Sequence, residues 1–100
     1  MRMIALYKTP PDTEAFDRAY FGTHLSLLAK VPGLEKTVVS RFTRTVMGEG
    51  LYLMAEMFFP DEATLKAALK TPQMGDVGRN LASFAEGLVS LMWAVEVHPA

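Results

Sequence analysis

Cysteine is absent from this 100-residue chain, which excludes disulfides, thiolate nucleophiles and thiolate metal sites and fits a reducing cytoplasm. An excess of one charge is absent too, because ten Lys and Arg residues face eleven Asp and Glu residues. This balance offers no electrostatic attraction for nucleic acid or an anionic membrane, and we expect neither partner. Apolar runs long enough for a signal peptide or a membrane span are also missing, so we expect a cytoplasmic protein.

Metal ligands and cofactor motifs are equally scarce. The two histidines, His24 and His98, lie far apart in the sequence, and we expect no metal site. The chain has no glycine-rich phosphate loop and no nucleophile elbow. The sequence therefore predicts no cofactor.

Half of the residues are apolar, which for this length predicts a single globular domain over residues 1–100. Apolar, β-prone runs predict four strands, at 3–7, 36–46, 51–59 and 88–97. Asp12 is placed to cap a helix that ends at Val31-Pro32-Gly33. Asp61 caps a second helical region, which restarts at Thr71-Pro72 and closes at Gly87. The predicted order is βαββαβ, an α+β fold with its middle strands joined as an antiparallel hairpin.

The strands are apolar on both faces. In the 51–59 run, Leu53, Ala55 and Met57 share one face, while Met54 and Phe58 lie on the other. Two helices cover only one face, and each large apolar side chain left in water forfeits roughly 1.5–3 kcal/mol. We therefore expect a homodimer that pairs sheet to sheet. A monomer with a partly apolar outer face is the alternative.

His24 is the leading candidate for chemistry, because helical spacing places it on the inward stripe with Tyr20 and Leu28. An imidazole there could exchange a proton with a bound ligand. The alternative is a neutral histidine that serves only the core. Tyr20 and Asp17 share its helical arc, although Tyr20 could be a core aromatic and Asp17 a surface residue.

Four further residues are candidates to line a ligand cavity: Tyr7, Phe42, Glu56 and Trp93. Glu56 lies mid-strand, where an unpaired carboxylate is costly. It should either pair with Arg41 or Arg44 or act as a pocket acid with a raised pKa. For the aromatic residues, core packing is the alternative. The seven methionines suit either an adaptable apolar cavity or a densely filled core.

Several motifs together resemble the EthD family. They are Asp12-x-x-x-Phe16, Thr23-His24-Leu25-x-Leu27, Val31-Pro32-Gly33-Leu34, Glu56-Met57-Phe58-Phe59 and Thr71-Pro72-Gln73. The resemblance covers nearly the whole chain, although Ser26 stands where the family often has proline. It implies a ferredoxin-like fold with a four-stranded antiparallel sheet that pairs into a dimeric α/β barrel. It also implies a cleft between sheet and helices, bordered by His24.

Relatives of this family include cofactor-free monooxygenases, muconolactone isomerases and polyketide cyclases. The resemblance thus favours a homodimer that binds or transforms a small, mostly apolar organic molecule, with His24 and Tyr20 as catalytic candidates. A non-catalytic accessory or interaction dimer is the main alternative. A haem enzyme with His24 as axial ligand is a third, since barrel relatives include haem proteins.

Overall fold

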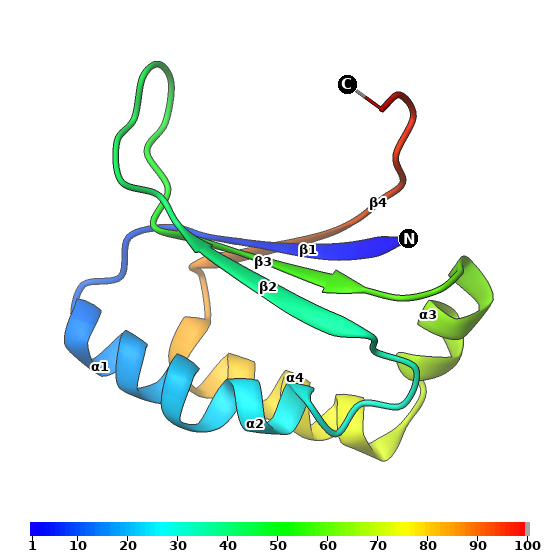
Figure 1. Cartoon of the computed structure of the whole chain (residues 1–100). Coiled ribbons are helices and arrows are strands. Elements are labelled where there is room, and N and C mark those ends of the chain that lie inside the picture. The colour runs from blue at the N-terminus through cyan, green and yellow to red at the C-terminus, as the bar shows by residue number, and fades with distance from the viewer. Residues whose placement is uncertain (100) are drawn as a thin grey trace.

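The computed structural model describes residues 1–99 and has two layers, with the helices packed on one face of a sheet (Figure 1). The strands are β1 (Arg2–Tyr7), β2 (Lys36–Arg41), β3 (Leu53–Phe58) and β4 (Val89–Ala94). The helical elements are α1 (Thr13–Ala19), η1 (Tyr20–His24), α2 (Leu25–Leu28), α3 (Glu62–Ala68) and α4 (Pro72–Ala85). The strand order is β2-β3-β1-β4 and all neighbours are antiparallel, which confirms the predicted α+β class and its ferredoxin-like topology.

The helix boundaries follow the local signals in the sequence. Asp12 Oδ1 accepts a hydrogen bond from the Ala15 amide at 3.0 Å, and Asp61 Oδ1 accepts one from Thr64 at 2.7 Å. Thr71 caps α4, whose first residue is Pro72, a position where the missing N–H costs nothing. Gly33 and Gly87 follow the helices at φ angles of 83° and 77°, in the left-handed region that glycine adopts readily. These signals were all predicted from the sequence, but α2 ends at Leu28, before the predicted stop at Val31-Pro32-Gly33, because the amides of Lys30 and Val31 bond to carbonyls three residues back instead of four.

Three strand ends were predicted wrongly. β2 ends at Arg41 rather than at residue 46, and β3 begins at Leu53 rather than at residue 51. The last hydrogen bond between them joins the Phe42 amide to the Tyr52 carbonyl, and residues 43–50 beyond it are exposed. β4 ends at Ala94 because Ala94 pairs with Arg2, the first residue of β1, so residues 95–97 lie beyond the partner strand. A strand ends where its neighbour does, whatever its own β propensity.

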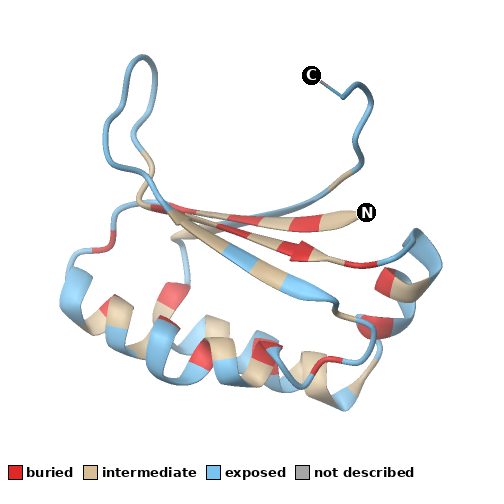
Figure 2. Ribbon diagram, viewed as in Figure 1, coloured by how far each residue is buried: buried red, intermediate tan, exposed pale blue. Residues whose placement is uncertain are grey.

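Burial alternates along the central strands. Met3, Ala5 and Tyr7 are buried against the helices, whereas Ile4 and Leu6 on the other face are only half-buried (Figure 2). β3 repeats this pattern. The apolar outer face predicted from the sequence is therefore present, and no helix of residues 1–99 covers it. The β2–β3 loop and the C-terminal segment both extend from the sheet on this side (Figure 1).

Within residues 1–99, no helix is both long and apolar enough to cross a membrane. In the same residues, no three His, Asp or Glu side chains gather as a metal site would require.

Candidate functional site

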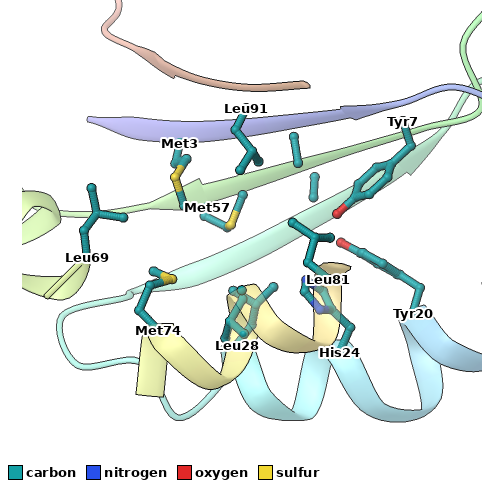
Figure 3. A pocket seen from close by; sticks show the side chains of 14 residues that line it. Met3, Tyr7, Tyr20, His24, Leu28, Met57, Leu69, Met74, Leu81 and Leu91 are labelled. Atoms are coloured by element: carbon teal, nitrogen blue, oxygen red, sulfur yellow. The ribbon is translucent and has the colours of Figure 1, made fainter. Parts of the chain in front are cut away.

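A cavity of about 170 Å³ lies between the inner face of the sheet and the helices (Figure 3). Its wall is formed by β1, β3, β4, η1, α2 and α4, together with Leu69, which follows α3. Most of the lining is hydrocarbon or thioether. The polar groups come from Tyr7, Tyr20 and His24, which gather at one end, while Met3, Met57 and Met74 lie toward the other (Figure 3).

A π-helical turn, η1, presents two of these polar residues. The Leu25 amide donates to the carbonyl of Tyr20, five residues earlier, instead of the usual four. Tyr20 and His24, at the two ends of the turn, are both buried against the sheet, with exposures of 0% and 3%. Single π-turns inside helices occur often at functional sites. The sequence predicted an uninterrupted helix here, with the same two residues facing inward.

His24 is held by Asn80, a residue of α4. His24 Nδ1 lies 3.0 Å from Asn80 Oδ1, and because an amide oxygen only accepts, Nδ1 carries the proton and Nε2 keeps its lone pair. Burial lowers the pKa of His24 below its ordinary value, and the Asn80 hydrogen bond opposes this shift only in part. At neutral pH the imidazole is therefore uncharged, with one nitrogen able to accept a proton.

The sequence reasoning missed Asn80. A signal for it existed, because an amide at this position lies three residues from the inward-facing Val77 and four from Phe84, which packs on His24, in the same helix. A polar side chain on the inward side of an amphipathic helix needs a partner. Which partner it finds depends on the packing of α4 against η1, which the sequence does not give.

Tyr20 and Tyr7 form the second polar pair. Their rings meet edge to face with centroids 5.5 Å apart, and their hydroxyl groups point toward one another (Figure 3). Even so, the buried Tyr20 hydroxyl makes no hydrogen bond to any residue in 1–99. Burial raises the pKa of Tyr20 to about 12, and the nearby Tyr7 hydroxyl opposes this shift in part. Burial also raises the pKa of Tyr7, and the neighbouring Tyr20 hydroxyl adds to that shift. Both phenols are thus neutral hydrogen-bond donors at physiological pH.

Other aromatic rings fix the orientation of the polar ones. The Phe16 ring is parallel to that of Tyr20, with centroids 5.9 Å apart. Phe84 of α4 meets His24 edge to face at 5.4 Å. Edge-to-face and offset-stacked pairs of this kind favour defined ring orientations. The polar end of the cavity is therefore built from side chains with little freedom to turn.

Among the remaining candidates, Trp93 lies on the cavity side of the sheet but does not line the cavity. It pairs with Met3 in the sheet register and so lies on the helix side, but it is 41% exposed. The structure does not bring Phe42 to the cavity, because Phe42 borders a separate hollow under the β2–β3 loop. Asp17 also lies elsewhere, where it accepts hydrogen bonds from Tyr52 at 2.8 Å and Arg41 at 3.3 Å.

Glu56 lies on the outer face of the sheet, away from the cavity. The expectation that Arg41 or Arg44 pairs with it was wrong, because its carboxylate binds Arg2 Nη1 at 2.7 Å. The reason is the strand order: β3 lies between β2 and β1, and residue 2 is a diagonal neighbour of Glu56 on the outer face. Arg41 lies on the inner side, opposite Leu53, and binds Asp17 instead.

The model of the EthD domain matches residues 8–87. The chain belongs to the EthD family. A crystal structure of an ethyl tert-butyl ether degradation (EthD) family protein from Bacillus halodurans is 40% identical, with a TM-score of 0.90 over 96% of this chain and 97% of that one. An uncharacterized 11.0 kDa protein of Rhodococcus erythropolis is 25% identical over 95% of this chain and 93% of its own.

The fold also matches a more distant structure. A dimeric protein of unknown function with a ferredoxin-like fold, from Bacteroides fragilis, aligns with a TM-score of 0.63 at 19% identity. The alignment covers 91% of this chain and 90% of that one. This likeness concerns the fold alone.

Proposed function

We propose that this EthD protein is a homodimer in which each subunit binds a small, mostly apolar organic molecule in the cavity between sheet and helices. The observation that carries the proposal is the cavity itself, an apolar space with a neutral histidine and a free tyrosine hydroxyl at one end. Small-molecule sites commonly combine an apolar wall with a few convergent polar groups.

His24 is the proton acceptor of this site. Its Nε2 has a lone pair, and the hydrogen bond from Nδ1 to Asn80 supports the positive charge that would form on protonation. A ligand O–H or activated C–H placed at Nε2 can transfer its proton there, which leaves an imidazolium and a ligand anion. Tyr20 then supplies a hydrogen bond to the anion.

The outer face of the sheet supports the proposed homodimer. Ile4, Leu6, Met54 and Phe58 are only half-buried there, and Met92 is 43% exposed. Side chains of this kind stabilise a fold by roughly 1.5–3 kcal/mol each when they are fully buried. A second copy set sheet to sheet would bury them. The Bacteroides fragilis neighbour is a dimeric protein, which supports a dimer for this chain.

The methionines allow a direct test of ligand binding. Met3, Met57 and Met74 line the cavity, while Met47 lies in the exposed loop and Met92 on the outer face. Protein labelled with ¹³C at the methionine methyl groups should be titrated with toluene by NMR. The three cavity methyl signals should move by ring-current shifts, and those of Met47 and Met92 should stay in place.

A matched variant completes this test. Ala55 is 1% exposed and lines the cavity, so Ala55→Leu fills part of the space without adding a polar group. Toluene should no longer move the three signals in the folded variant. Equal shifts in wild type and variant, or no shift in wild type, would contradict the proposed binding site.

A further inference from the structure

We propose that the natural ligand class of this cavity is a carbonyl compound about the size of one substituted ring, with its oxygen hydrogen-bonded to Tyr20. This inference rests on the function proposed above and specifies what the site selects. It starts from the Tyr20 hydroxyl, which belongs to a fully buried residue and has no hydrogen-bond partner among residues 1–99. A buried polar group without a partner costs about 1–3 kcal/mol of stability. A hydrogen bond from this hydroxyl to a bound ligand would offset that cost.

The pair of tyrosines leaves one O–H donor free. Their hydroxyls point toward each other within the cavity (Figure 3), and each phenol has one proton. The neighbouring hydroxyl raises the pKa of Tyr7 and lowers that of Tyr20, which is the pattern for Tyr7 as donor and Tyr20 as acceptor, so Tyr20 still has its own proton to donate. At least one O–H group is therefore left for a ligand atom that accepts. A carbonyl oxygen fits, since it has two lone pairs and needs no acceptor from the protein.

The rest of the cavity limits what else the ligand can carry. Away from the tyrosines and His24, the wall is made by residues such as Met3, Met57, Met74, Leu81 and Leu91. A second polar group of the ligand would lose its hydrogen bonds to water there and regain none from the wall. The ligand should therefore be hydrocarbon apart from the end that meets Tyr20 and His24.

The cavity volume limits the size of the ligand. A cavity of about 150 Å³ is known to hold benzene, and this one measures about 170 Å³. Leu69 and Leu91, at 41% and 52% exposure, mark the side on which the cavity reaches the surface, so a short chain on the ring can extend there. A single ring with a small carbonyl substituent fills the enclosed part.

A matched pair of probes tests this inference. Acetophenone has the required carbonyl, and α-methylstyrene has the same shape with a CH₂ group in place of the oxygen. Affinities for both should be measured by the methionine NMR titration, in wild type and in Tyr20→Phe. The variant should lose about three- to tenfold in affinity for acetophenone, as expected for one hydrogen bond, and should bind α-methylstyrene within about twofold of wild type. Tyr52→Phe, whose hydroxyl binds Asp17 outside the cavity, should change neither affinity.

The outcomes separate this inference from the proposed function. If neither probe binds the wild type, the proposed function itself is wrong. If both bind but Tyr20→Phe leaves the acetophenone affinity unchanged, binding stands and the carbonyl inference is overturned. Should the variant not fold, the infrared C=O stretch of bound acetophenone in wild type decides: a shift to lower frequency supports the hydrogen bond, and a stretch as in hydrocarbon solvent refutes it.

Discussion

Replacing Tyr20 by Phe should make the ligand-free protein more stable. Most tyrosine-to-phenylalanine changes in a core remove a hydrogen bond, but the Tyr20 hydroxyl makes none within residues 1–99 and is fully buried. The change relieves the desolvation cost of about 1–3 kcal/mol and gives up only the packing of one oxygen atom. We expect a net gain of about 1 kcal/mol, which raises the melting temperature of a chain this size by about 4–8 °C.

The assay is urea unfolding followed by circular dichroism. Wild type and variant must be compared at the same protomer concentration, because the stability of a dimer depends on concentration. Tyr52→Phe is the matched control: its hydroxyl donates to Asp17 at 2.8 Å, so this variant should lose roughly 0.5–1.5 kcal/mol. If Tyr20→Phe loses stability to the same extent, the hydroxyl is hydrogen-bonded in the free protein and our reasoning about it is refuted.

Three further predictions concern the helix, the histidine and the outer face. Gly78 lines the cavity within α4 and Gly22 lies in η1, and a Cβ added to either meets no atom within 4 Å. Replacing either glycine by alanine should raise the free energy of unfolding in urea by roughly 0.5–1 kcal/mol. Only Gly78→Ala should weaken toluene binding, because only Gly78 lines the cavity. Because the pKa of His24 is lowered in the folded state, the unfolded chain binds more protons than the folded chain as the pH falls below 6.5. The free energy of unfolding should therefore decrease below this pH in the wild type and change less in His24→Gln. Native mass spectrometry should find a dimer for the wild type and monomers for Met92→Asp, because the carboxylate would be buried without a partner between the two sheets. The control variant Ala82→Asp, on the exposed side of α4, should remain a dimer. A dimeric Met92→Asp would count against sheet pairing.

The sequence was a good guide wherever a feature depends on near neighbours in the chain. Asp12, Asp61 and Thr71 form their caps with residues three positions away, and Gly87 directly follows the C-cap of α4 in the left-handed conformation. His24 and Tyr20 face inward because spacing along one helix decides it. These features required no knowledge of the tertiary fold.

The errors come from features that depend on the order of the strands. Glu56 pairs with Arg2 because β1 lies beside β3, and β4 stops opposite the first residue of β1. The π-turn and the Asn80 contact depend on how α4 packs against η1. Local composition contains no signal for the register between segments more than fifty residues apart, and this explains why Arg2 was missed as the partner of Glu56.

A crystal structure of the protein soaked with acetophenone would test the central claim most directly. We expect the ring between the sheet and α4, against Met57 and Met74, with its carbonyl oxygen about 2.5–3.0 Å from the Tyr20 hydroxyl. Electron density for acetophenone only on the outer face of the sheet, or an empty cavity at saturating concentration, would contradict the account.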